Sequence, residues 1–350
     1  MLYPLKFKPV YKDYVWGGRN FEKLGKQLPE GIVAESWEVS CHKNGTSIIA
    51  NGEFEGITLP NLIRLLGRDL IGTELPEKDL EKFPLLVKFI DADKNLSVQV
   101  HPDDSYARTN ENGEYGKNEM WYIIAAKPGA KLVYDLRSGI TREAFAQAVK
   151  DNKVEDCLKS MEVFPGDAIN IPSGLIHAIG QGIMLAEVQQ NSDTTYRVYD
   201  YGRTDRPIHI EKALDVIDFD SEGRKEKYEG LELDLGNGSS KKYIIASNYF
   251  SVEIYNIDGN VTENATGEKF YIYTVFEGSG SLTWDTGSLD IRAGESFLIP
   301  AALGKYALTG RLKALKCYVP NIEKDVLKPL MKSGYSKENI LTSIGGITVK

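Results

Sequence analysis

The sequence predicts a mainly β protein made of two related β-barrel units with a few inserted helices. Three observations support this fold class. Short apolar runs bounded by Gly, Pro, Asn or Asp recur along the chain, helical periodicity is confined to two stretches, and two blocks of sequence occur twice in the same order. A length of 350 residues suits about two domains.

The apolar runs have the length and the β-branched or aromatic content expected of strands in a sandwich or barrel. They cover residues 85–90, 121–126, 168–171, 183–188, 243–246, 250–255, 270–276 and 296–299.

The two helical stretches are expected to be insertions in the β fold. Over residues 58–72, leucine and isoleucine recur on one helix face behind the candidate cap Thr58 and a first-turn Pro60. Over residues 141–160, Thr141 is the candidate cap, and the next apolar side chains continue one face.

The repeated blocks suggest two units of common design. Residues 119–124 resemble residues 268–273, and residues 165–172 resemble residues 293–300. The polar stretch that follows residue 217 suits an exposed connection. The predicted organisation is a metal-binding catalytic unit at 1–220, a connecting segment at 221–240, a degenerate second unit at 241–320 and a tail of unknown role at 321–350.

Composition limits the class of partner. A net charge of −8 and a pI near 5.3 argue against nucleic-acid binding and against binding to an anionic membrane. Three widely separated cysteines support neither a disulfide framework nor a thiolate zinc site. Because the first residues lack the apolar core of a signal peptide, we expect a cytoplasmic protein. We also expect it to bind a small molecule and to be either a monomer or a homodimer.

Nitrogen- and oxygen-bearing side chains form a candidate metal site in the first unit. Gln99 and His101 are two residues apart on an expected strand, so both point to one face. Glu119 begins a buried strand, and His177 follows a Pro-Gly turn. Each residue alone is more often structural, but together they suit Zn²⁺, with Mn²⁺, Fe²⁺ or Co²⁺ as alternatives. No histidine follows His209, so the second unit cannot repeat this ligand set.

Two cations also stand out because apolar residues flank them. Lys88 interrupts the run 85–90, where an unpaired charge would be costly. Arg197 lies in a strand-like run between Tyr196 and Val198, so we expect it to face a pocket.

These motifs resemble a known family. Residues 166–177 resemble the second motif of the cupin superfamily, with Gln181 where the family often has Asn. Six blocks in family order resemble type I phosphomannose isomerase, most closely its short bacterial form. The blocks are residues 35–38, 84–92, 97–103, 117–122, 172–177 and 195–202.

The resemblance implies an aldose–ketose isomerase that interconverts mannose 6-phosphate and fructose 6-phosphate through an enediolate. It implies one Zn²⁺ per chain, held by Gln99, His101, Glu119 and His177, and a catalytic Arg197. It also places three polar residues around the sugar phosphate, namely Lys88, Ser97 and Lys117.

The general base stays open at this point. The candidates are a metal-bound hydroxide and the carboxylates of Glu35, Glu38 and Glu187. His42 and His209 are expected to be structural, and Arg203 and Arg206 to lie on the surface.

Two other functions are compatible with a cupin scaffold, because a fold does not fix a chemistry. The first is a different metal-dependent cupin, such as an iron dioxygenase or another sugar-phosphate isomerase. The first two candidate ligands, Gln99 and His101, form a Gln-x-His sequence in place of a closely spaced His pair, which disfavours this function. The second is a non-catalytic sugar-binding bicupin, which the intact ligand set of the first unit disfavours.

Overall fold

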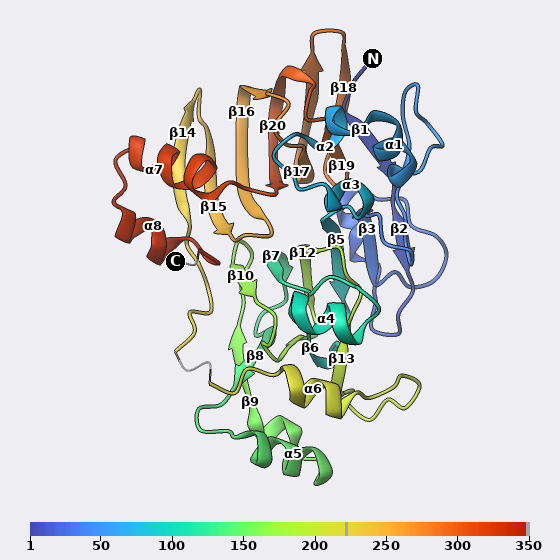
Figure 1. Cartoon of the computed structure of the whole chain (residues 1–350), viewed down its shortest axis with the longest axis vertical. Helices are drawn as coiled ribbons and strands as arrows, with labels where there is room; N and C mark the ends of the chain where they lie inside the picture. Colours follow the sequence, from blue (N-terminus) through green and yellow to red (C-terminus); the bar gives the residue numbers. More distant parts are fainter. Residues whose placement is uncertain (221–222, 348–350) are drawn as a thin grey trace.

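The computed structural model describes residues 1–220 and 223–347, and its framework is three antiparallel sheets (Figure 1). The prediction of a mainly β protein is confirmed. Two sheets form the first unit, in the lower half of Figure 1, and one large sheet forms the second unit above it.

The first unit is a sandwich of a six-stranded and a five-stranded sheet. The six-stranded sheet has the order β10 (Ala168–Ile171), β7 (Glu119–Ala126), β12 (Ile183–Gln190), β5 (Leu85–Ala92), β3 (Glu35–Val39) and β2 (Val10–Lys12). The five-stranded sheet has the order β13 (Tyr196–Tyr199), β6 (Val98–Val100), β11 (His177–Ile179), β8 (Lys131–Leu136) and β9 (Leu158–Glu162). Buried side chains from both sheets, including Trp121, Leu132 and Leu185, fill the space between them.

The six-stranded sheet is covered on both faces. Its second face packs against the second unit, where Val87, Phe89 and Val188 contact a core shared with Val252 and Ile272. Every residue of β5 and β12 is therefore buried, which explains their nearly continuous apolar sequences.

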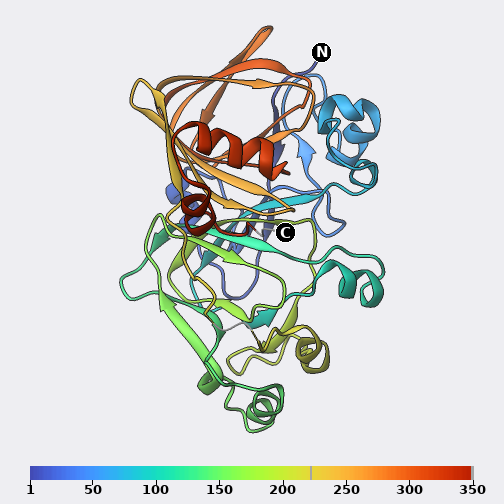
Figure 2. The ribbon, with the colours of Figure 1, turned by 60° about the vertical axis from the view of Figure 1, so that its left-hand side comes forward.

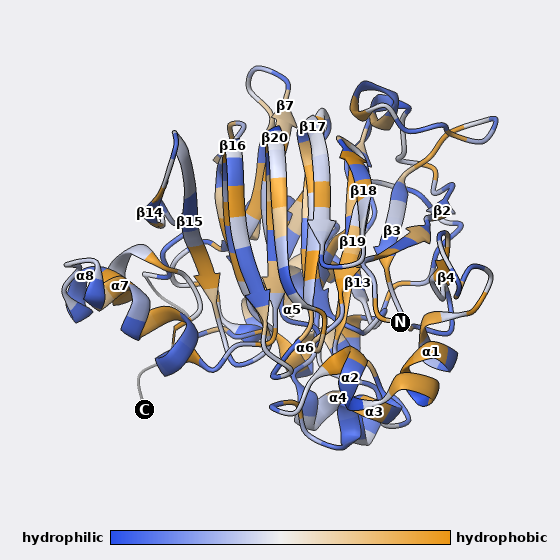
Figure 3. Ribbon diagram, turned by 90° about the horizontal axis from the view of Figure 1, so that it is seen from above, coloured by the Kyte–Doolittle hydropathy of each residue, from blue (hydrophilic) through white to orange (hydrophobic). Residues whose placement is uncertain are grey.

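The second unit is one nine-stranded sheet around its own aromatic and aliphatic core. Its strands are β14 (Leu231–Gly236), β15 (Ser239–Ala246), β16 (Ser251–Ala265), β20 (Gly304–Tyr318), β17 (Tyr271–Trp284), β18 (Gly287–Arg292), β19 (Ser296–Ile299), β1 (Leu5–Lys8) and β4 (Ile48–Ile49). Figure 3 shows apolar and polar bands alternating along β16, β20 and β17, as expected for strands with one face on a core.

Strands from the N-terminal part of the chain complete this second sheet. β1 pairs with β19 through Leu5 and Leu298, and it pairs with β4 through Phe7 and Ile49. Strands from residues 1–220 thus form part of the second sheet, across the boundary that the sequence predicts near residue 220. Local sequence patterns do not report such long-range strand pairing.

The first helical insertion is present and is divided at a glycine. α1 (Leu59–Leu66) begins after Thr58 with Pro60 in its first turn, and α2 (Arg68–Ile71) follows Gly67, whose φ is +53°. A left-handed backbone interrupts a regular helix and favours glycine.

The second helical insertion is shorter than predicted. α5 (Arg142–Lys150) begins where Thr141 Oγ1 accepts a hydrogen bond from Ala144 N, as expected of an N-cap. Residues 151–160 are not an α-helix, because Asn152 adopts a φ of +56° and ends it. A 3₁₀ turn (Val154–Cys157) and β9 follow. The remaining short helices are a 3₁₀ turn at Asn20–Leu24, α3 (Lys78–Glu81), α4 (Asp104–Asn110) and α6 (Ile210–Val216).

The C-terminal tail packs on the second unit (Figure 2). A π-helical turn (Ile322–Leu327), α7 (Lys328–Lys332) and α8 (Lys337–Ser343) bury Val326, Leu330 and Ile340 against Leu231 and Tyr243. The segment predicted as a connection, 221–240, contains β14 and the start of β15, and its residues 221–222 lie outside the described part. Within the described ranges, no helix has the length and apolar content needed to cross a membrane.

The two units repeat a strand pair, but with a different register from the predicted one. Ile171 of β10 lies opposite Glu119 of β7, whereas Ile299 of β19 lies opposite Tyr271 of β17. The structural counterpart of Glu119 is therefore Tyr271, three residues beyond the predicted Glu268. The apolar strings look alike in either register, so sequence alone did not fix the alignment.

Candidate metal centre

The candidate ligands lie between the two sheets of the first unit. His177, the first residue of β11, lies opposite Gln99 of β6. Glu119, the first residue of β7, comes from the facing six-stranded sheet. His101 directly follows β6, so it shares a face with Gln99.

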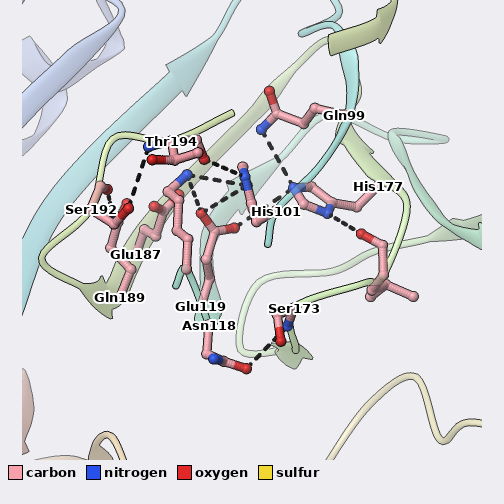
Figure 4. A network of polar contacts seen from close by, with 12 residues as sticks. Gln99, His101, Asn118, Glu119, Ser173, His177, Glu187, Gln189, Ser192 and Thr194 are labelled. Atoms are coloured by element: carbon pink, nitrogen blue, oxygen red, sulfur yellow. Dashed lines mark hydrogen bonds and ion pairs between the residues drawn. The ribbon is translucent and has the colours of Figure 1, made fainter. Parts of the chain in front are cut away.

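The structure brings three of these side chains into one cluster (Figure 4). Ligand atoms of His101, Glu119 and His177 all lie within 4.8 Å of one another, and all three residues are buried. Glu119 Oε1 is 3.3 Å from His101 Nε2, and Glu119 Oε2 is 3.8 Å from His177 Nε2. The Gln99 amide is adjacent, with its Nε2 3.4 Å from His177 Nε2.

Hydrogen bonds fix the orientation of both imidazoles. His101 Nδ1 donates to the Thr194 carbonyl and His177 Nδ1 donates to the Leu175 carbonyl, each at 2.9 Å. The protonated nitrogen of each neutral ring is thereby engaged, so the Nε2 lone pairs of both rings face Glu119. Backbone carbonyls commonly orient metal-binding histidines in this way.

The charge states of the cluster suit a divalent cation. Burial lowers the pKa of His177 to about 3 and lowers the pKa of His101, so both rings are neutral. Burial alone would raise the pKa of Glu119, but the Lys117 ammonium and His101 hold it well below its usual range. Neither Glu119 oxygen accepts a well-formed hydrogen bond from the described residues. Two neutral imidazoles, an ionised carboxylate and an amide oxygen fit Zn²⁺.

Two buried lysines border the cluster. Lys117 Nζ is 2.5 Å from Glu119 Oε1 and 3.1 Å from His101 Nε2. Lys88 Nζ is 3.1 Å from Glu187 Oε1 and 3.6 Å from Glu35 Oε2. These pairings explain how cations are tolerated inside apolar strands.

Of the three carboxylates that are candidates for the general base, Glu187 and Glu35 line the pocket beside the cluster. Burial and the charge of Glu119 raise the pKa of Glu187 to about 7. Glu38 lies elsewhere: it pairs with Lys26 at 2.8 Å and accepts a hydrogen bond from Ser36. Glu35 and Glu38 are three residues apart on one strand and point to opposite faces, and Glu38 does not line this pocket.

Arg197 of β13 lies on the other side of β6, opposite Gln99. Its Nε donates to Ser97 Oγ at 3.1 Å, and its Nη1 donates to the Pro207 carbonyl at 2.9 Å. Arg197 is half-buried, and burial together with the charge of Arg206 lowers its pKa. The guanidinium is therefore held at the pocket that also contains Gln99 and Lys117.

The pocket, about 270 Å³ in volume, includes residues that the sequence did not indicate. Arg206 and His209 line it, so Arg206 faces the pocket rather than only the surface, and His209 also accepts a hydrogen bond from Arg197 N, in keeping with a structural role. Further lining residues that were not singled out include Tyr14, Trp16, Asp193 and Thr195. Arg206 and His209 follow Arg197 closely in sequence. Their nearness to the motif at residues 195–202 is the one sequence feature that points to them.

Comparisons with known proteins agree with this geometry. Residues 4–126 match the family described as phosphomannose isomerase type I, catalytic domain, and residues 239–319 match the mannose-6-phosphate isomerase cupin domain. The chain belongs to the type I mannose-6-phosphate isomerase family. The match to a cupin domain agrees with the cupin-like fold class that the sequence predicts.

Members of the family from two bacteria align over nearly their whole length. Mannose-6-phosphate isomerase ManA of Bacillus subtilis (strain 168) is 38% identical over 314 residues, 88% of this chain and 96% of the relative. Mannose-6-phosphate isomerase of Streptococcus mutans serotype c is 34% identical over 90% of this chain and 98% of the relative. A crystal structure of the Bacillus subtilis mannose 6-phosphate isomerase covers 90% of this chain and 99% of its own, with a TM-score of 0.83 and 33% identity.

Proposed function

We propose that this enzyme interconverts mannose 6-phosphate and fructose 6-phosphate at the pocket between the two sheets of the first unit. The observation that carries the proposal is the convergence of the His101 and His177 Nε2 atoms on the Glu119 carboxylate, beside a pocket that Gln99, Lys117 and Arg197 line. The relatives' names supply the substrate. The chain's own residues supply the reasons for the chemistry.

Gln99, His101, Glu119 and His177 would hold one Zn²⁺. When bound, Zn²⁺ acts as a Lewis acid that stabilises negative charge on substrate oxygens. Arg197, fixed by Ser97 and the Pro207 carbonyl, presents a second positive charge to the enediolate. Because its position is set before substrate binds, little reorganisation accompanies charge development.

Glu187 is our choice for the group that moves the proton between C1 and C2. It lines the pocket, and a pKa of about 7 makes both of its protonation states accessible near neutral pH. Lys88, 3.1 Å from Glu187, would hold the carboxylate in place and stabilise its ionised form. Glu35, which accepts a hydrogen bond from Trp37 Nε1 and lies near Lys88, would support this arrangement.

Substrate binding is assigned to Ser97, Lys88 and Lys117, together with the arginines at the pocket mouth. Both lysines are almost fully buried and already paired with carboxylates, so they would act from the inner end of the pocket. The three cysteines are all free, in keeping with the proposed cytoplasmic location. The oligomeric state stays a prediction of monomer or homodimer.

Metal content and isomerase activity measured together test the proposal. The purified protein should contain about one Zn²⁺, lose activity on chelation and regain it when Zn²⁺ is added back. His177→Ala should lose metal, whereas Arg197→Ala should retain it and lose about 10²- to 10³-fold in kcat, as for other lost charge-stabilising donors. Full activity in metal-free protein would refute the metal's role, and equal metal loss in both variants would refute the separate roles of His177 and Arg197.

A further inference from the structure

A second cavity of about 560 Å³ lies outside the metal pocket, and no described residue lines both. It is bounded by one face of α1, by the end of α3 and the segment that follows it, by the turn after β3, by Glu114 and by Asn191 after β12. The volume falls in the range of small-molecule sites. Its lining residues are Cys41, His42, Lys43, Pro60, Ile63, Arg64, Gly67, Leu80, Glu81, Lys82, Phe83, Glu114 and Asn191.

One residue of the cavity lining, Asn191, has a buried acceptor without a donor. The Asn191 side chain is 2% exposed, and its Nδ2 donates to the Phe83 carbonyl at 3.0 Å. This bond fixes the amide orientation, because turning it over would place two oxygens together. Asn191 Oδ1 then has no hydrogen-bond donor among residues 1–220 and 223–347. A buried acceptor left in this state costs about 1–3 kcal/mol, so a donor from a ligand would be favoured here.

The walls are mostly apolar. Pro60, Ile63 and Gly67 recur at three- and four-residue spacing along one face of α1 and at its end. Leu80 and Phe83 form the opposite side. A bound molecule would gain from burying apolar surface against this wall.

The rim has an excess of positive charge. Lys43, Arg64 and Lys82 contribute three positive charges, against the two carboxylates of Glu81 and Glu114, a balance of +1. Glu114 is already shared by Lys82 at 3.1 Å and Lys43 at 3.4 Å. Arg64 is exposed and makes no ion pair with the residues that the structure describes, so its guanidinium is available to an anionic group.

We propose that this cavity binds a small amphipathic organic anion, with an apolar ring system that carries an N–H donor. The donor would reach Asn191 Oδ1, the ring would lie against Ile63 and Leu80, and the anionic group would meet Arg64 at the rim. A hexose phosphate alone lacks the apolar surface for the wall, so this site is distinct in chemistry from the metal pocket.

Three probes have the required chemistry: AMP, GMP and 1-anilinonaphthalene-8-sulfonate. Each joins a ring system with an N–H donor to an anionic group. Isothermal titration of the zinc-loaded, full-length protein should detect at least one of them binding with 1:1 stoichiometry. Saturating mannose 6-phosphate should not displace it, because the two cavities share no lining residue.

Two variants locate the bound probe. Arg64→Glu should weaken its affinity at least fivefold, whereas the charge-matched control Lys305→Glu, on an exposed residue of the second unit, should not change it. Asn191→Ala should weaken binding about tenfold. Arg64→Glu changes an exposed side chain away from the metal pocket and should retain isomerase activity, so it serves the test even if Asn191→Ala folds poorly.

The proposal fails if none of the three probes binds at millimolar concentration. It also fails if mannose 6-phosphate displaces the bound probe, or if Arg64→Glu and Lys305→Glu weaken binding equally. None of these outcomes bears on the isomerase proposal, which is tested by metal content and turnover.

Discussion

The second cupin unit contains a buried polar cluster that should make its stability depend on acid pH. Glu263 of β16 accepts a hydrogen bond from Tyr255 at 2.6 Å and lies 3.3 Å from Lys316 Nζ. Lys316 is 3% exposed and lies over the Tyr271 ring at 4.2 Å. Removing the Glu263 charge would leave this buried ammonium without its ionic partner.

The size of the effect follows from the pKa of Glu263. Burial alone would raise it, but Lys316 and Lys241 lower it from 4.5 to about 2. Because the folded-state pKa is depressed, the ionised carboxylate stabilises the fold above pH 4.5, and this contribution is lost as the pH falls from about 4.5 towards 2. At about 1.4 kcal/mol per pKa unit, the difference between 4.5 and about 2 corresponds to about 3–4 kcal/mol at neutral pH.

Urea unfolding of Glu263→Gln and wild type at pH 7, 5 and 3 tests this reasoning. The variant should be less stable by about 3–4 kcal/mol at pH 7, and the difference should shrink by pH 3 because the Glu263 carboxyl of the unfolded wild type is then protonated. Glu277→Gln is the matched control, because Glu277 pairs with Lys313 at 3.1 Å on an exposed surface and should contribute less than about 1 kcal/mol. A difference between Glu263→Gln and wild type that stays constant from pH 7 to pH 3 would refute the assigned charge interaction.

Two further substitutions test the backbone contact between Gly72 and Glu268 and the ion pairs of Asp200 with Arg203 and Arg206. Gly72→Ala should cost at least about 2 kcal/mol in thermal or urea unfolding, because the residue has a φ of +100° and its Cβ would lie 2.2 Å from the Glu268 carbonyl oxygen. Gly56→Ala, at φ +87° with open space around the Cβ, should cost less, and equal costs would contradict the contact. Asp200→Ala should cost about 2–4 kcal/mol and raise KM for mannose 6-phosphate, because buried Asp200 pairs with both Arg203 and Arg206. An unchanged KM would show that Arg206 does not act on substrate.

The strands were predictable where burial leaves a local pattern. β5 and β12 are buried on both faces and therefore appear as continuous apolar runs, in which Lys88 and Glu187 stand out. β1 and β4 were not predictable as parts of the second sheet, because their pairing joins residues nearly 300 positions apart in the case of Leu5 and Leu298. Helix α5 ends early through the backbone conformation of Asn152, which apolar periodicity does not report.

The metal ligands were predictable for a related reason. Gln99 and His101 obey the two-residue periodicity of a strand, and Glu119 is conspicuous at the start of a buried one. Asp193 and Arg206 line the same pocket from loops, where no periodicity fixes a direction. Glu38 lies on the opposite face of β3 from Glu35, as strand alternation over a three-residue spacing predicts.

The interiors of the two units differ in how their buried polar groups are paired. In the second unit, buried polar groups pair with one another: Tyr273 Oη and Tyr306 Oη are 3.0 Å apart, and Tyr318 donates to Glu253 Oε1 at 2.5 Å, although Glu253 Oε2 has no hydrogen-bond donor among the described residues. In the first unit, His101 Nε2 and His177 Nε2 converge on the Glu119 carboxylate, and the Lys117 ammonium lies beside them, 2.5 Å from Glu119 Oε1 and 3.1 Å from His101 Nε2. Two neutral imidazole nitrogens and a carboxylate within 4.8 Å of one another form a ligand set that suits a divalent cation, which is the physical reason to assign the metal and the chemistry to the first unit.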